Sequence, residues 1–230
     1  LQTMGTTAQQ QTKTLTSVQR GLDSLAKTTN EQIKPFIRDI VTTRSLQDFL
    51  MDHGLEELVK WTAKTKTTVI YDSAVDDFTP DWFFTKVKGK GNVAVIGFTS
   101  DGDVFGGFYK KPQVEKGAYV MDPDMFVFSF ESHGRCETPK QFHAFEYLKP
   151  RLWVRSYGND CTSGFIHFQT DTVNGHELAG FFLGNERSNS YCQNMSKGFK
   201  DIQDTTLSGR SGKSWSQCHR CLRIVAVQVS

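Results

Sequence analysis

The sequence lacks any long apolar run, since its longest uninterrupted stretch is the six residues from Val93 to Phe98. A helix that crosses a bilayer needs about 20 apolar residues, so no membrane-spanning helix is predicted. The chain also shows no signal-peptide pattern, and its five cysteines are an odd number. Both features argue against a disulfide framework and predict free thiols in the cytoplasm, with the nucleus as an alternative.

Recognisable catalytic motifs are also scarce. Gly89–Ala94 fits G-x-G-x-x-A, but it follows a predicted helix and precedes a predicted strand, the reverse of a dinucleotide site. Gly212–Ser214 resembles the end of a P-loop, yet Leu207 occupies the place of the first glycine. There is no G-x-S-x-G elbow, and His176 has no H-E-x-x-H context. The sequence therefore predicts neither an enzyme nor a cofactor.

Charge is nearly balanced, with 27 basic and 25 acidic residues and a net charge of +2. The C-terminal part differs: Glu186 to Ser230 holds seven basic and three acidic residues, a net charge of +4. Such a tract is either solvated loop surface or a site for phosphates. The candidate nucleic-acid contacts are Arg187, Lys197, Lys200, Arg210, Lys213, Arg220 and Arg223.

One cysteine pair has the spacing of a zinc knuckle, Cys218 and Cys221. A structural zinc site needs four ligands, and the spacing selects no second pair. A redox dithiol would need a helix N-terminus, whereas this pair leads into a predicted strand. The alternative is two small apolar residues beside that strand. The further ligands that could complete a zinc site are Cys192, His167, or His133 with Cys136.

The first 33 residues are polar but carry a heptad pattern. Its apolar positions recur at spacings of three and four, which is typical of a coiled coil and ends before Pro35. The alternatives are a frayed tail or a helix packed on the domain. The sequence predicts a coiled-coil stalk over 1–33 and short helices over 34–65. The oligomerisation residues would be Leu15, Val18, Leu22 and Leu25.

From residue 66 onward the pattern changes to short strands. A helix is expected from Thr79 to Gly89, and the turn Thr99–Gly102 predicts an antiparallel hairpin. Many short strands with few helices predict a mainly β fold with flanking helices, a two-sheet antiparallel sandwich over 66–230. The eight predicted strands are Thr67–Tyr71, Val93–Phe98, Val104–Tyr109, Met125–Phe130, Leu152–Arg155, Gly164–Phe168, Leu178–Leu183 and Leu222–Val229.

Several of these segments resemble the TLDc domain in order and spacing. They are Val69–Ser73, Asp77–Phe78, Phe83–Lys86, Gly89–Gly91, Asp101–Phe108 and Asp122–Ser129, followed by weaker matches at Gly175–Glu177 and Asn189–Tyr191. The resemblance implies a sandwich of two antiparallel sheets and a function that is not enzymatic. It also implies a role in oxidative-stress protection or an interaction with the peripheral part of the vacuolar proton-pumping ATPase, with which TLDc proteins are associated.

Two hypotheses follow for the function. The first is a TLDc protein-binding module that forms a homo-oligomer through its coiled coil, with ATPase subunits as candidate partners. The second is a DNA-binding transcriptional regulator that uses the basic C-terminal segment, which is not a recognised feature of the family. Adjacent glycines in the Asp101–Phe108 segment, Gly106 and Gly107, indicate a bulge or a close backbone approach.

Overall fold

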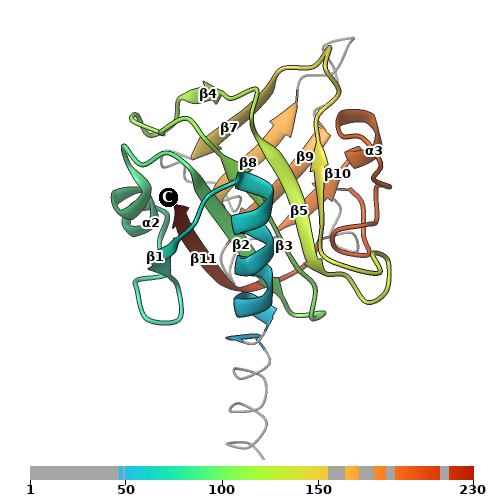
Figure 1. Ribbon diagram of the computed structural model, residues 1–230, viewed down its shortest axis with the longest axis horizontal. Coiled ribbons are helices and arrows are strands. Elements are labelled where there is room, and N and C mark those ends of the chain that lie inside the picture. The colour runs from blue at the N-terminus through green and yellow to red at the C-terminus, as the bar shows by residue number, and fades with distance from the viewer. Residues whose placement is uncertain (1–46, 49, 155–163, 171–178, 185–189, 213–217) are drawn as a thin grey trace, which may run out of the picture. The chain divides into compact units, whose positions relative to one another are not determined.

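The computed structural model describes residues 47–48, 50–154, 164–170, 179–184, 190–212 and 218–230 (Figure 1). The chain divides into two compact units, 1–49 and 50–230. The predicted coiled coil, with Leu15, Val18, Leu22 and Leu25, lies outside the described residues. The unit 50–230 holds the features from which a function can be argued.

The larger sheet has six antiparallel strands, and the last strand of the chain lies inside it between the first two. The predicted hairpin is confirmed, because β2 and β3 pair from Val93↔Tyr109 to Phe98↔Val104. In spatial order the strands are β1 (Thr67–Asp72), β11 (Cys221–Val229), β2 (Val93–Thr99), β3 (Val104–Tyr109), β5 (Phe126–Glu131) and β6 (Lys140–His143).

The smaller sheet has five strands, also antiparallel, and two of them are only three residues long. The predicted mainly β, two-sheet antiparallel fold is therefore confirmed, and every predicted strand is present in the described residues. Three strands were not predicted: β4, β6 and β10. The spatial order is β10 (Tyr191–Gln193), β9 (Ala179–Gly184), β8 (Gly164–Thr170), β7 (Pro150–Val154) and β4 (Tyr119–Met121).

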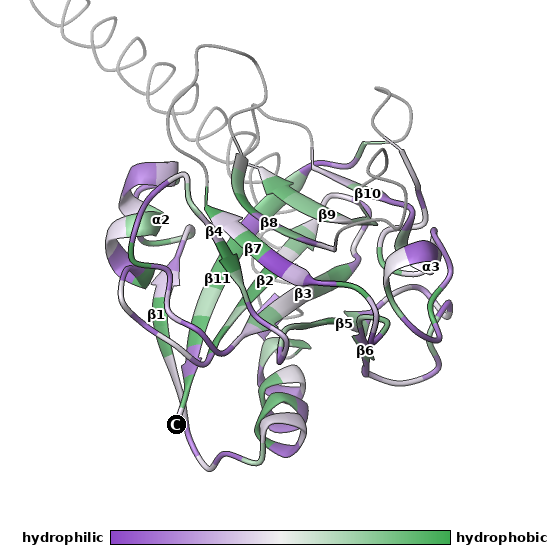
Figure 2. Ribbon diagram, turned by 90° about the horizontal axis from the view of Figure 1, so that it is seen from above, coloured by the Kyte–Doolittle hydropathy of each residue, from purple (hydrophilic) through white to green (hydrophobic). Residues whose placement is uncertain are grey.

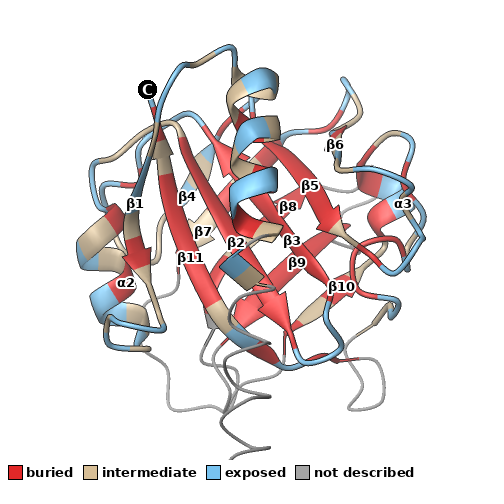
Figure 3. Ribbon diagram, turned by 60° about the horizontal axis from the view of Figure 1, so that its bottom comes forward, coloured by how far each residue is buried: buried red, intermediate tan, exposed pale blue. Residues whose placement is uncertain are grey.

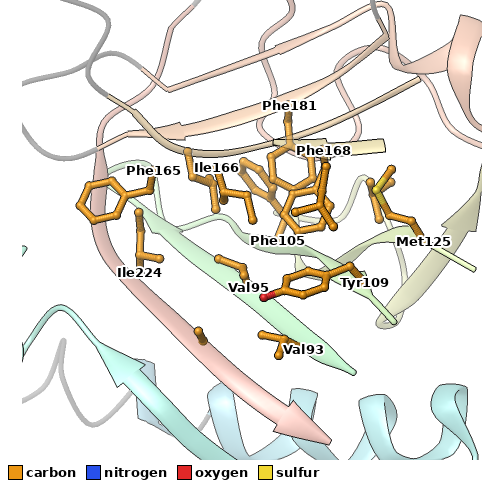
Figure 4. Close-up of a cluster of buried hydrophobic side chains, with 14 of the residues drawn as sticks. Val93, Val95, Phe105, Tyr109, Met125, Phe165, Ile166, Phe168, Phe181 and Ile224 are labelled. Carbon is orange, nitrogen blue, oxygen red and sulfur yellow. The ribbon is translucent and has the colours of Figure 1, made fainter. Parts of the chain in front are cut away.

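The core fills the space between the two sheets. Phe105 of β3 points toward Phe168 of β8 and Phe181 of β9, as Figure 4 shows, and its ring meets that of Phe181 edge-on at 5.3 Å. Apolar residues are concentrated in the strands, whereas the helices α2 (Pro80–Val87) and α3 (Met195–Gly198) carry hydrophilic residues (Figure 2). Burial of these large aromatic side chains is the main stabilising term for such a sandwich.

A helix over residues 50–62 covers the outer face of the six-stranded sheet. Leu58 is fully buried there, and the Trp61 ring lies 6.0 to 6.2 Å from the rings of Phe126, Phe128 and Phe130. The central strands β2 and β3 are consequently buried along their whole length (Figure 3). Burial on both faces explains why these strands are nearly continuous apolar runs rather than alternating ones.

The predicted helix after Thr79 is confirmed as α2 (Pro80–Val87), and α3 (Met195–Gly198) is one additional turn. The Thr79 side chain accepts a hydrogen bond from the Trp82 backbone N–H at 3.3 Å, as an N-cap does. Phe83 packs edge-on against Tyr71 of β1, with ring centroids 5.2 Å apart. Among the helices of the described residues, none has the length and apolar character that crossing a bilayer requires.

Candidate protein-binding edge

Asp72, in the segment Val69–Ser73, forms a bidentate ion pair with Arg223. Its two oxygens accept from the guanidinium Nε at 2.9 Å and Nη2 at 2.6 Å. The two side chains are only 13% and 11% exposed. This pair joins β1 to β11 and leaves the carboxylate occupied by a structural contact.

Asp103 occupies a second motif position and is 2% exposed. Its Oδ1 contacts His133 Nδ1 at 2.9 Å and accepts from the Arg135 guanidinium. Arg135 in turn donates from Nε to the Thr206 carbonyl at 3.1 Å. Asp103 therefore ties the β2–β3 turn to two other loops, which is again a structural role.

Asp122, at the start of the segment Asp122–Ser129, is fully buried next to β4. Its Oδ2 accepts from the backbone N–H groups of Lys110 and Lys111, the latter at 2.9 Å, and its Oδ1 accepts from Asp124 N–H at 3.1 Å. Three donors satisfy the buried charge. The carboxylate fixes the end of β3 against the end of β4.

Among the described strands, β4 is the terminal one of the smaller sheet and pairs only with β7 (Figure 1). The Asp122 N–H donates inward to the Pro150 carbonyl at 3.0 Å. Because successive residues of a strand point their backbone groups to opposite sides, the N–H groups of Met121 and Tyr119 point outward. Such an edge can pair with a strand of another chain.

A row of aromatic rings starts at β4 and crosses all five strands. Each ring is paired in register with the next, and the centroids along the row are 5.7, 5.1, 4.3 and 5.4 Å apart. Tyr119, at the β4 end of the row, is 50% exposed, and the neighbouring Met121 is 39% exposed. The row consists of Tyr119, Trp153, His167, Phe182 and Tyr191.

Buried side chains hold the loop before β4 in place. The Gln113 amide donates to the carbonyls of Glu115 at 2.6 Å and Ala118 at 2.9 Å. The Trp153 indole N–H donates to the Gly117 carbonyl at 2.9 Å. β4 is thus presented by a loop that is already ordered, which lowers the entropy cost of binding a partner.

The exposed Tyr119 and Met121 and the half-buried Arg151 and Trp153 give this edge the composition of an interaction site. Arg151 places its guanidinium carbon 4.5 Å from the centre of the Tyr119 ring, beside Trp153 and Met121. Tyr, Trp, Arg and Met are the residue types enriched at the centre of protein interfaces. Sequence reasoning missed this site because it missed β4. Tyr119 and Trp153 lie far apart in the sequence and belong to no periodic hydrophobic pattern.

The structure separates the candidate zinc ligands. Cys221 is fully buried and donates its thiol proton to the Arg223 carbonyl at 3.2 Å, while His133 contacts Asp103 and His167 stands in the aromatic row. Burial raises the pKa of the Cys221 thiol to about 12, and also raises that of Cys218. In the described part of the chain, no three His, Cys, Asp or Glu side chains form a group able to hold a metal.

The candidate nucleic-acid contacts lie on several elements. Lys200 pairs with Glu146 at 2.9 Å and Arg210 with Asp101 at 2.7 Å, and Arg223 is the partner of Asp72. Arg220 is exposed before β11, and Lys197 lies in α3. Arg187 and Lys213 lie outside the described residues. Three of the basic side chains thus already face a carboxylate.

A groove of about 720 Å³ lies on another part of the molecule. Its apolar lining includes Phe142, Phe199 and Ile202, which are almost fully buried. Both Lys140 and Glu137 also line it, so its charge has no single sign. The groove therefore gives no indication of ligand chemistry comparable with that of the β4 edge.

A family model described as the TLDc domain matches residues 40–208. No match was found among the curated proteins.

Proposed function

Because the chain belongs to the TLDc domain family, we propose that it is a protein-binding module and not an enzyme. The motif carboxylates support this proposal, since Asp72, Asp103 and Asp122 each hold the fold together through hydrogen bonds. A catalytic carboxylate would instead need to reach a substrate. The family motifs are thereby explained as requirements of the scaffold.

The observation that carries the proposal is the exposed β4 edge. Tyr119 and Met121 present outward-facing backbone groups and partly exposed side chains at the same place. Strand addition takes affinity from backbone hydrogen bonds and specificity from alternate side chains. We propose that a protein partner binds here through an extended segment.

The family resemblance indicates which partner to test first. We propose a subunit in the peripheral part of the vacuolar proton-pumping ATPase, in a process related to oxidative-stress protection in the cytoplasm or nucleus. The coiled-coil residues Leu15, Val18, Leu22 and Leu25 would bring several copies of the module together, which raises avidity.

Binding of the full chain to the purified peripheral part of the ATPase tests this proposal. Tyr119→Ser combined with Met121→Pro should weaken binding by about tenfold or more, because it removes an anchor ring and an outward N–H. Leu222→Ser is the control, since Leu222 is 46% exposed and lies on β11, a strand of the other sheet. If the control variant weakens binding equally, the β4 edge is not the binding site. If the wild-type chain does not bind, the ATPase is not the partner.

The competing hypothesis of a DNA-binding regulator has less support. Lys200, Arg210 and Arg223 face Glu146, Asp101 and Asp72, and pairing with a phosphate would require breaking these contacts. Titration with duplex DNA at several salt concentrations tests it. A steep loss of affinity with salt, and weaker binding by Arg220→Glu with Lys197→Glu, would favour DNA binding over the edge.

A further inference from the structure

Basic residues outnumber acidic ones around the end of β4 at Met121, because the only carboxylates described there are those of the buried Asp122 and of Asp124, which is paired with Lys110. Lys111 is held there because its N–H donates to Asp122 Oδ2 at 2.9 Å, and Lys149 precedes Pro150, whose carbonyl accepts from Asp122 N–H at 3.0 Å. Arg151 is directly opposite Met121 in the sheet register. Lys111 and Lys149 are both exposed, and no ion pair is recorded for either among the described residues.

The opposite end of β4 has a different charge. Glu115 is exposed in the loop before Tyr119. The neighbouring Lys116 is in an ion pair with Asp81 of α2 and thus contributes no uncompensated charge. The edge is consequently basic at its Met121 end and slightly acidic at its Tyr119 end, and this asymmetry distinguishes the two directions in which a strand could add.

Geometry determines which side chains of an added strand face the aromatic row. Residues opposite Tyr119 and Met121 would project from the same outer face, and they lie two positions apart. Tyr119, with Arg151 above its ring, favours apolar or aromatic side chains at these two positions. Antiparallel addition, the commoner arrangement, places the N-terminal part of the added segment at the Met121 end.

We propose that the β4 edge binds an extended peptide segment in which acidic residues precede two apolar residues at alternate positions. The segment adds antiparallel to β4, its carboxylates lie near Lys111, Lys149 and Arg151, and its apolar side chains rest beside Tyr119 and Met121. This inference rests on the proposed function and defines the chemistry of the partner at the same site.

Three labelled peptides test the inference by fluorescence anisotropy on the full chain. The first is Asp-Asp-Glu-Ile-Thr-Val-Thr, the second has the same residues in reverse order, and the third replaces the acids with Asn-Asn-Gln. The first should bind about tenfold more tightly than the third, with a difference that shrinks as salt rises. Equal affinity of the first and third peptides, tighter binding of the reversed one, or no binding by any of them would overturn the inference.

Substitutions in the chain locate the effect. Lys111→Gln with Lys149→Gln should reduce the preference for the acidic peptide to about twofold or less, whereas Lys140→Gln, an exposed lysine on β6, should leave it unchanged. If the preference survives in Tyr119→Ser with Met121→Pro, the acidic peptide binds elsewhere and the inference fails. If the inference fails while the ATPase interaction still depends on Tyr119, the proposed function stands, so the two failures can be told apart.

Discussion

Gly107 on β3 lies directly against the ring of Phe168 on β8, so that a Cβ atom on this glycine would overlap the ring. Its neighbour Gly106 has no more room, because a Cβ there would overlap the Val95 carbonyl on β2. The close backbone approach expected at these glycines is confirmed. The irregularity in the pairing of β3 with β5 lies between Val104 and Phe105 instead. Gly107 therefore sets the distance between the two sheets, whereas Gly106 permits the close approach of the neighbouring strand β2 within its own sheet.

Gly107→Ala should reduce the free energy of unfolding by about 1–3 kcal/mol, because it overpacks the core. Urea denaturation would measure the change. In a double-mutant cycle, Phe168→Leu should lower the cost of the added methyl group, since it removes the ring that the methyl group meets. If Gly107→Ala leaves the free energy of unfolding unchanged, the close contact between the sheets is contradicted.

Asp122→Ala should destabilise the chain by about 2 kcal/mol or more, because three backbone donors lose their acceptor in a buried place. It should also weaken partner binding, since the carboxylate fixes the end of β4. Asp124→Asn is the control, because Asp124 is 56% exposed and its ion pair with Lys110 is exposed too. Similar losses of stability in both variants would contradict this role of Asp122.

His219 should make the chain sensitive to acid. Its ring is 3% exposed and packs edge-on against Phe105, and neither ring nitrogen has a hydrogen-bond partner among the described residues. Burial lowers its pKa from 6.5 to about 4. As the pH falls from 6.5 toward 4, the histidine of the unfolded chain takes up a proton and that of the folded chain does not. The free energy of unfolding therefore decreases over this pH range.

The decrease in the free energy of unfolding that is attributable to His219 is at most about 3 kcal/mol. Thermal unfolding of the wild-type chain and of His219→Gln, measured from pH 7 to pH 4.5, checks the effect. The variant should show a shallower decline, because glutamine does not titrate. Parallel curves for the two chains would show that His219 does not titrate as its burial requires.

The cysteines should differ widely in reactivity toward alkylating reagents. Cys192 and Cys221 are fully buried, and burial raises the pKa of both thiols to about 12. Cys136 is half-buried and lines the groove. Iodoacetamide at pH 8 followed by peptide mass spectrometry should find Cys136 modified before Cys192 and Cys221, which should react only in denaturant. Rapid native modification of Cys221 would contradict its placement in the core.

Removal of residues 1–33 should leave a folded monomer, since the two sheets and the helix over 50–62 form their own core. Light scattering should show a smaller assembly than the full chain, with an unchanged unfolding temperature. A deletion that unfolds would show that the segment belongs to the core. A deletion that keeps its oligomeric state would place the oligomer interface outside Leu15, Val18, Leu22 and Leu25.

The long elements of the fold could be predicted from the sequence because each carries its own local signal. β2 is rich in apolar β-branched residues and β3 in aromatic ones, and α2 has Thr79 and Pro80 at its start. β4, β6 and β10 are three or four residues long. Such strands exist because neighbouring strands supply their hydrogen bonds, and that information is not local.

The candidate site was missed for the same reason. Tyr119 and Trp153 are 34 positions apart in the chain, yet the sheet register brings them into direct contact. Only the pairing of β4 with β7 creates this contact, and nothing near either residue in the sequence indicates that pairing. The motif carboxylates, by contrast, were visible in the sequence, but their structural roles needed the partners Arg223 and Arg135.

The position of β11 in the middle of the larger sheet constrains how the protein is made. β1 has no neighbour in its sheet other than β11, and β11 also pairs with β2. Until β11 has been synthesised, β1 therefore has no partner among the described strands. A premature stop codon before Cys221 leaves both β1 and the edge of β2 exposed to aggregation and proteolysis.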